Sequence, residues 1–255
     1  MKLVVCGKGG SGKSTVIALL AKAYAKAGRR VIVIDTDESN AGLHRLLGIE
    51  PPRDLMEFFG GKKTMMASFK EARENNAPSP LEGAKIIDNI PGIYLSKKDG
   101  VSLVAIGKIH QAGEGCACPM GALAKQFIAG LTLSGNDVVL IDTEAGIEHF
   151  GRGIDKVCNA IVMVIDPSFE SLTLARMVAE MAGTIDVPLY YILNKTDAAT
   201  AETLRKAIPD KNRIIGEFPQ DTAILAAGLE GRELPSGYLT VSSVTDRLGV
   251  SAGSP

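Results

Sequence analysis

The sequence predicts an α/β fold in which a mostly parallel central sheet is flanked by helices on both faces. Short apolar runs rich in β-branched residues recur along the chain, and runs such as residues 31–34 and 160–165 lack polar alternation. This pattern indicates strands that are buried on both faces. Ala- and Leu-rich segments with helical spacing lie between these runs. Because strands and helices alternate, right-handed crossovers should make the strands parallel.

The individual elements follow from these patterns and from the turn residues between them. The expected strands are residues 2–6, 30–35, 137–142, 160–166, 187–194 and 212–217, and the expected helices are residues 13–27, 120–134, 169–182 and 200–208. Residues 50–118 contain many structure breakers and predict an irregular insertion. Inside it, residues 93–96 and 101–107 predict a hairpin appended to the sheet. We therefore expect one domain over residues 1–255 that carries this insertion.

Composition and charge exclude several classes of protein. The chain has 28 Lys and Arg against 29 Asp and Glu, a net charge of -1 and a pI near 6.3, which argues against a nucleic-acid partner. It contains no apolar run of the roughly 20 residues that span a bilayer, no segment typical of a signal peptide and no basic amphipathic helix near its end. Four cysteines are too few for a disulfide framework. We expect a cytoplasmic protein without a membrane partner.

A phosphate-binding loop follows the first expected strand and precedes the first expected helix. Its sequence satisfies G-x-x-x-x-G-K-[ST] in the strand–loop–helix context that this pattern requires. The backbone N–H groups of such a loop and the positive end of the helix converge on phosphate oxygens. Lys13 is expected to reach the β- and γ-phosphates, and Ser14 to bind Mg²⁺. The loop that predicts a nucleoside triphosphate site comprises Gly7, Lys8, Gly9, Gly10, Ser11, Gly12, Lys13, Ser14 and Thr15.

Carboxylates at the ends of parallel strands belong to the ligand-binding edge of such a sheet. Asp142 ends the strand at 137–142 in the sequence Leu-Ile-Asp, and we expect it to hold Mg²⁺ through water. Gly146 follows four residues later and could offer its N–H to the γ-phosphate, thereby sensing hydrolysis. Asp35 and Glu144 could cap nearby turns and are weaker candidates.

Lys8 is a second lysine that an ordinary phosphate loop does not need. The pattern K-G-G-x-G-K-S, matched from Lys8 to Ser14, resembles the deviant Walker A ATPases, which include MinD, ParA and the nitrogenase iron protein. The resemblance implies that Lys8 crosses a dimer interface to the partner's nucleotide. It therefore implies a homodimer that sandwiches ATP. It also implies that Asp37, after the second strand, positions the attacking water.

The nucleobase site is expected at the end of the strand at 187–194. The resemblance implies that Asn194 reads adenine and that Pro219, in the loop 218–221, flanks the base. However, Asn194, Lys195 and Asp197 also match Asn-Lys-x-Asp, the guanine signature of GTPases, in which the aspartate accepts hydrogen bonds from guanine. The motif fits both bases, and the lysine in the phosphate loop favours ATP.

A Cys-x-Cys pair, Cys116 and Cys118, lies just before the helix expected at 120–134. The positive end of a helix lowers the pKa of nearby thiols. A closed zinc site needs four ligands, and a two-fold axis beside this segment would bring two pairs together. The pair therefore predicts a Zn²⁺ or Ni²⁺ site shared across a dimer, against the alternatives of a disulfide-prone loop or two incidental thiols. We expect Cys6 and Cys158 to be small buried residues.

The wider sequence distinguishes among subfamilies. No cysteine follows Asp142 until Cys158, so the cluster pattern of the nitrogenase iron protein is absent. Together with Cys116 and Cys118, residues 145–149 resemble the CooC-type nickel-insertion ATPases that mature carbon monoxide dehydrogenase, and related accessory ATPases of acetyl-CoA synthase. This resemblance implies an ATP-dependent homodimer that serves a nickel enzyme. The alternatives are a GTP-dependent nickel chaperone of the hydrogenase-maturation type and a MinD/ParA-like positioning ATPase.

Overall fold

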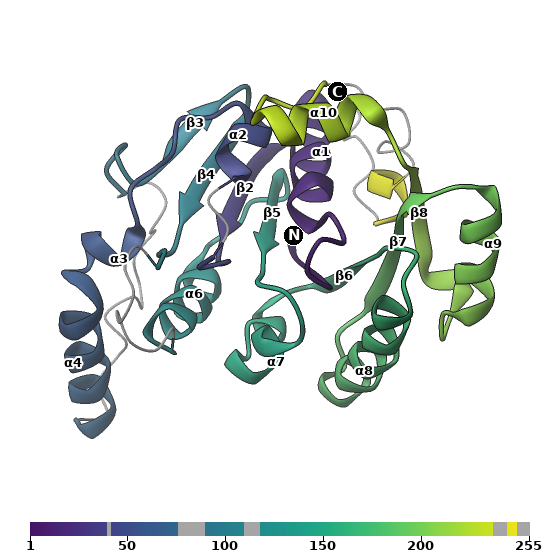
Figure 1. The fold of residues 1–255 in the computed structure, drawn as a ribbon. Coiled ribbons are helices and arrows are strands. Elements are labelled where there is room, and N and C mark those ends of the chain that lie inside the picture. The colour runs from purple at the N-terminus through teal and green to yellow at the C-terminus, as the bar shows by residue number, and fades with distance from the viewer. Residues whose placement is uncertain (40–41, 76–89, 110–117, 237–243, 249–255) are drawn as a thin grey trace.

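A computed structural model describes residues 1–39, 42–75, 90–109, 118–236 and 244–248. Within these ranges eight strands form one sheet in the order β3-β4-β2-β5-β1-β6-β7-β8 (Figure 1). All neighbouring strands are parallel except β3 and β4, which confirms the predicted fold class. The strands are β1 (Lys2–Gly7), β2 (Arg30–Asp35), β3 (Ser96–Lys98), β4 (Val101–Ala105), β5 (Asp137–Asp142), β6 (Ala160–Ile165), β7 (Leu189–Thr196) and β8 (Ile214–Pro219).

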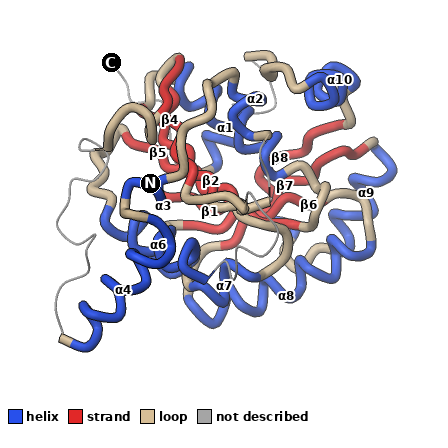
Figure 2. The backbone as a smooth tube through the Cα atoms, turned by 60° about the vertical axis from the view of Figure 1, so that its left-hand side comes forward, coloured by secondary structure: helices blue, strands red, loops and turns tan. Residues whose placement is uncertain are grey.

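Helices cover both faces of the sheet (Figure 2). On one face α1, α2 and α10 contribute to the core, and on the other face α3, α4, α6, α8 and α9 do so. The helices and 3-10 turns are α1 (Lys13–Lys26), α2 (Leu43–Leu47), α3 (Leu55–Phe58), α4 (Gly61–Glu74), α6 (Cys118–Gly130), α7 (Glu148–Arg152), η1 (Asp155–Val157), α8 (Phe169–Ile185), α9 (Ala198–Ala207), η2 (Lys211–Arg213) and α10 (Thr222–Glu230).

The core explains why the central strands lack polar alternation. Successive side chains of a strand point to opposite faces, and in β1 Leu3 and Val5 join the cluster under α1, whereas Val4 and Cys6 join the cluster on the other face. All four are fully buried. A strand with apolar layers on both sides gains burial from every residue, so the sequence shows an unbroken apolar run.

The hairpin in the insertion is real, but its strands begin and end at other residues than we expected. Asp99 and Gly100 have φ values of 47° and 81°, the two positive values that a two-residue type I′ turn requires. The strands therefore flank this pair directly, as β3 and β4, and residues 93–95 form a turn instead of a strand. Moreover, β4 pairs in parallel with β2, so one arm of the hairpin is a full member of the main sheet.

Helix α4 was not predicted from the breaker-rich sequence of residues 50–118. It starts at Gly61, where φ is 84°, because the glycine pair that suggested a loop instead lets the chain turn into the helix. Met65 is buried on the helix, and Phe69, four residues later, packs against the same core cluster. This spacing places both on one face, and in Figure 1 the helix extends away from the body of the sheet.

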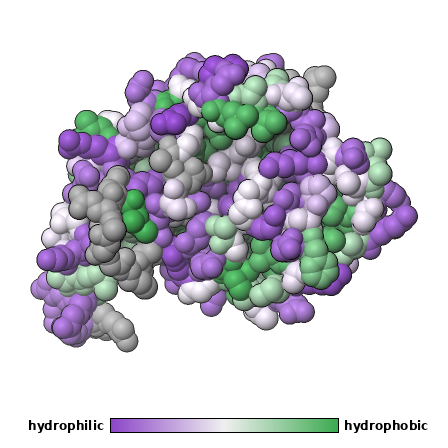
Figure 3. Space-filling model, viewed as in Figure 1, coloured by the Kyte–Doolittle hydropathy of each residue, from purple (hydrophilic) through white to green (hydrophobic). Residues whose placement is uncertain are grey.

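None of the helices in the described ranges is long and apolar enough to cross a membrane. Apolar residues gather on the visible face over α10 and over α8 (Figure 3). The exposed large side chains there include Leu225 and Leu229 on α10 and Phe169 and Met177 on α8.

Candidate nucleotide site

The loop between β1 and α1 lies at the carboxyl end of a central strand, where open α/β sheets bind their ligands. Gly12, at the N-cap of α1, has a φ of 97° and no side chain caps the helix. The first backbone N–H groups of α1 are therefore available to an anion. Lys13, the first residue of the helix, is 7% exposed. The geometry fits the role that the sequence predicts for this loop.

Asn194 and Lys195 brace this loop from the end of β7. The Asn194 side-chain amide donates to the Ser11 carbonyl at 2.7 Å, and Lys195 Nζ donates to the Gly10 carbonyl at 2.7 Å. A Cβ atom on Gly12 would lie 2.2 Å from Asn194 Nδ2, so only glycine fits beneath that amide. Both side chains thus stabilise the backbone conformation of the phosphate loop. The sequence motif alone did not predict this structural role.

Ser14 and Asp142 meet beneath the loop and place two oxygen groups side by side. Ser14 Oγ donates to Asp142 Oδ2 at 2.7 Å, while Asp142 Oδ1 is buried and has no hydrogen-bond partner among the residues that the structure describes. Burial and the neighbouring Asp35 raise the pKa of Asp142 to about 7, against the Ser14 hydrogen bond and Lys13. Mg²⁺ prefers hard oxygen ligands such as these. An orphaned carboxylate oxygen next to a hydroxyl therefore fits the ion.

The loop after β2 is held tightly. Asp37 is 7% exposed, and its Oδ1 accepts hydrogen bonds from the Ser39 N–H at 2.9 Å and from Ser39 Oγ at 2.7 Å. Lys108 Nζ lies 2.7 Å from Asp35 Oδ2 and also donates to the Asp37 carbonyl. Burial raises the pKa of Asp35 to about 6, although Lys108 lowers it. Asp35 is thus an ion-pair partner that anchors this loop.

Lys8 and Gly146 are both engaged within the chain. Lys8 Nζ lies 3.2 Å from Asp166 Oδ2, just after β6. The Gly146 N–H donates to the Gly7 carbonyl at 3.2 Å. A γ-phosphate could take that N–H only if this contact with the phosphate loop opened. Gly146 is therefore placed where a movement of the phosphate loop and of the loop after β5 would be coupled.

A cavity of about 580 Å³ opens over the phosphate loop, a size typical of small-molecule sites. The predicted residues that line it are Gly9, Gly10, Gly12, Lys13, Ser14, Thr15, Asp37, Asn194, Lys195 and Pro219. Its far wall comes from α10, through Ile224, Leu225, Gly228 and Leu229, which sequence reasoning missed. The apolar run in residues 222–230 was the available signal. These side chains offer an apolar surface to a nucleobase.

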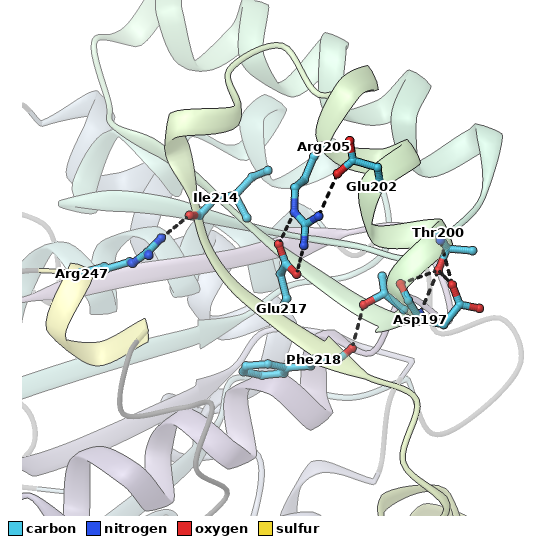
Figure 4. Close-up of polar contacts among 9 residues, drawn as sticks. Asp197, Thr200, Glu202, Arg205, Ile214, Glu217, Phe218 and Arg247 are labelled. Atoms are coloured by element: carbon cyan, nitrogen blue, oxygen red, sulfur yellow. Dashed lines mark hydrogen bonds and ion pairs between the residues drawn. The ribbon is translucent and has the colours of Figure 1, made fainter.

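The Asp197 carboxylate caps the start of α9. Its Oδ1 accepts from the N–H and the hydroxyl of Thr200, each at 2.8 Å, and the two residues form a capping box at the start of α9 (Figure 4). Asp197 is not among the described residues that line the cavity. The guanine-reading aspartate of GTPases needs a free carboxylate at the base, so this geometry favours adenine.

The predicted thiolate site cannot be judged from the described part of the chain. Cys116 lies outside it, and of Cys118 only the backbone, as the first residue of α6, is described. Within the described ranges no group of three or more His, Cys, Asp or Glu side chains could hold a metal ion. Cys6 is buried, as the sequence predicted, whereas Cys158 is only half-buried; both are free thiols.

The fold and the loop define a P-loop nucleotide-binding protein: a parallel sheet whose first strand leads through a glycine-rich loop into a helix. Comparison with known proteins identifies the family within this class. The family described as the CobQ/CobB/MinD/ParA nucleotide binding domain matches residues 2–234. The chain belongs to this family.

Three similar proteins illustrate the range of the family. An uncharacterized ATP-binding protein of Methanocaldococcus jannaschii is 44% identical over 97% of this chain and 99% of its own length. The carbon monoxide dehydrogenase accessory protein CooC of Rhodospirillum rubrum is 34% identical over 91% of this chain and 88% of its own length. The septum site-determining protein MinD of Pyrococcus horikoshii, solved with Mg-ADP, has a TM-score of 0.72 at 19% identity, covering 99% of this chain and 97% of that one. The last comparison shows a shared fold.

Proposed function

We propose that this chain is a single-domain cytoplasmic ATPase that dimerises with ATP and assists nickel insertion into carbon monoxide dehydrogenase or acetyl-CoA synthase. The observation that carries the proposal is the Cys-x-Cys pair, Cys116 and Cys118, on a chain with an intact phosphate loop and a second lysine, Lys8. The 34% identity to a carbon monoxide dehydrogenase accessory protein supports the choice of client. Thiolates suit Ni²⁺ or Zn²⁺ as cargo.

The nucleotide chemistry follows from the residues around the cavity. Lys13 and the N-terminal amides of α1 would bind the β- and γ-phosphates, and Asp37 would orient the attacking water. Ser14 and Asp142 would hold Mg²⁺, which when bound neutralises phosphate charge. The apolar wall of α10 and Pro219 would hold adenine. Lys8 would leave Asp166 and reach the phosphates of a second copy.

Two copies related by a two-fold axis would bring two Cys116/Cys118 pairs together as four thiolates, which suffices for a closed site. ATP-driven dimerisation would then form or reshape the metal site. Hydrolysis would reset it and release the metal or the client. In this way one chain links nucleotide state to metal transfer.

The first test measures metal content and solution mass together, with and without ATP. Wild type should hold about one Zn²⁺ or Ni²⁺ per dimer, and the Cys116→Ala/Cys118→Ala variant should hold none. Cys158→Ala removes a thiol outside the motif and serves as the matched control. Metal-free wild type that still forms ATP-driven dimers would contradict the metal-insertion role and leave a switch ATPase of this family.

The client is tested by producing carbon monoxide dehydrogenase with and without this chain at limiting nickel. Wild type should raise the nickel content of the enzyme, and Lys13→Ala should not, because nucleotide binding drives the cycle. Equal nickel content in all three preparations would rule out this client.

A further inference from the structure

Arg152 connects two loops that each carry a proposed active-site carboxylate. It is the last residue of α7, and its Nη1 donates to Glu38 Oε1 at 2.9 Å while its Nη2 forms an ion pair with Glu144 Oε1 at 2.8 Å. Glu38 directly follows Asp37, and Glu144 lies two residues after Asp142. One guanidinium therefore joins the loop after β2 to the loop after β5, and these two strands are neighbours in the sheet.

The contact is largely removed from water. The side chains of Glu38 and Arg152 are 6% and 22% exposed, and that of Glu144 is 22% exposed. Burial raises the pKa of both glutamates, and Arg152 opposes this shift in each case. Without the guanidinium, two acidic groups would repel each other in a poorly solvated place. Arg152 thus offsets this repulsion and adds a side-chain link between the two loops, next to the hydrogen bonds from the Thr36 N–H and hydroxyl to the Asp142 carbonyl.

The stem of Arg152 also lies against the first turns of α6. A Cβ atom on Gly121 would lie 2.5 Å from Arg152 Cδ, which is closer than real Cβ contacts, and 3.1 Å from Cγ, which is also tight. Glycine is otherwise unfavourable within a helix by about 1 kcal/mol. At this position the cost is offset by the close approach of the arginine, so the start of α6 is packed against the same side chain that holds both loops.

The chain on the other side of residues 110–117 is fastened to the same loop. The Ile109 N–H donates to the Glu38 carbonyl at 3.1 Å, and the neighbouring Lys108 pairs with Asp35 at 2.7 Å. Residues 108–109 therefore contact the loop after β2, which includes Glu38, and the first turns of α6 contact Arg152, the ion-pair partner of Glu38.

We infer that Arg152 is a positioning residue that couples occupancy of the nucleotide site to the N-terminal part of α6. Nucleotide and Mg²⁺ would act on Asp37 and Asp142, the loops that carry them would shift together because Arg152 binds both, and the contact with Gly121 would pass the shift to α6. Coupling requires such a contiguous set of packed groups, and it is reciprocal between the two ends. The inference rests on the proposed nucleotide function.

Hydrogen–deuterium exchange of residues 118–126 tests the coupling, with and without Mg²⁺ and a slowly hydrolysed ATP analogue. In wild type the analogue should change exchange in this segment by about fivefold or more, the lower end of typical couplings. Arg152→Gln should bind the analogue and lose this change. Arg176→Gln, an exposed arginine on α8, is the matched control. A role in stability alone would lower the melting temperature without removing the nucleotide-dependent difference.

Gly121→Ala gives a second variant in case Arg152→Gln fails to fold. It keeps every charge and improves helix propensity, yet it pushes the arginine stem aside, so the exchange response should again be lost while the analogue still binds. Arg152→Lys keeps the positive charge and should therefore retain part of the response that Arg152→Gln loses. An equal response in wild type, Arg152→Gln and Gly121→Ala would overturn the role of Arg152 in coupling but leave the proposed function standing. A wild type that does not bind the analogue would refute the proposed function as well.

Discussion

Lys8 and Asp166 form an ion pair of 3.2 Å within one chain, with the lysine one third exposed and the aspartate 15% exposed. Burial raises the pKa of Asp166, but hydrogen bonds from Ser171 and Ser168 together with Lys8 lower it below its ordinary value. The carboxylate is therefore ionised and ready to hold the lysine. If Lys8 reaches a second copy when ATP binds, this pair must first break.

Replacement of Asp166 by Asn should therefore favour the ATP-driven dimer. Partly exposed ion pairs contribute about 0.2–1 kcal/mol each, and a dimer breaks two of them, so the dimer dissociation constant should fall by roughly twofold to thirtyfold. Sedimentation of wild type and Asp166→Asn with ATP measures it. Lys8→Ala should lose the ATP-driven dimer altogether, and the double variant should behave like Lys8→Ala. Weaker dimers in Asp166→Asn would mean that the pair supports assembly instead of competing with it.

Lys13→Ala should weaken ATP binding by more than about tenfold, because a buried cation that contacts phosphate directly contributes about 1.5–3 kcal/mol. Lys26→Ala is the matched control, since Lys26 is an exposed lysine at the other end of the same helix. Titration calorimetry with ATP and Mg²⁺ compares the two. Equal affinities in wild type and Lys13→Ala would disprove the assignment of the phosphate loop.

Asp197 should have no influence on the choice between ATP and GTP. Its carboxylate caps α9 through Thr200, so Asp197→Ala should cost about 1 kcal/mol of stability, and Asp197→Asn should cost less because asparagine also caps helices. The ratio of ATP to GTP affinity should stay the same in both. A shift of that ratio by about tenfold, or 1.4 kcal/mol, would restore the guanine-reading hypothesis.

The strands and the phosphate loop could be predicted because their signals are local: an apolar run with no alternation, and a glycine pattern in a fixed strand–loop–helix context. The register of the hairpin could not, because it depends on the φ angles of Asp99 and Gly100. Likewise, no spacing of residues in the sequence predicts that Arg152 contacts Glu38 and Glu144. These residues are brought together by the order of the strands in the sheet.

Asp166 was within reach of sequence reasoning and was missed. It follows β6 directly, and the rule that singled out Asp142, a carboxylate at the end of a parallel strand, applies to it equally. The strand predicted over residues 160–166 ends at Asp166, which gives the residue a place in the sheet but no chemical role. The contribution of α10 to the cavity could not be predicted for a different reason. An apolar helical run is typical of any buried helix, and only the fold shows that this one lines the nucleotide cavity.

Asp155 should make the stability of the protein depend on pH. Its side chain is fully buried, and Oδ1 faces His149 Nε2 at 3.4 Å; within the described ranges neither carboxylate oxygen has a hydrogen-bond partner. Burial raises the pKa of Asp155 to about 7. From about pH 4 to pH 7 the unfolded chain therefore releases a proton from Asp155 that the folded protein keeps, and the contribution of Asp155 to the free energy of unfolding falls as pH rises.

Asp155→Asn does not titrate, so its advantage over wild type should be small at pH 4.5 and should grow to roughly 2–4 kcal/mol at pH 8. His149, whose pKa burial lowers to about 3, titrates in the opposite direction in both proteins and largely cancels in the difference. Urea unfolding at the two pH values measures the effect, with Glu180→Gln, an exposed acid on α8, as control. A difference between Asp155→Asn and wild type that is the same at both pH values would show that the carboxyl group of Asp155 is not held protonated by burial, because only a shifted pKa makes that difference depend on pH.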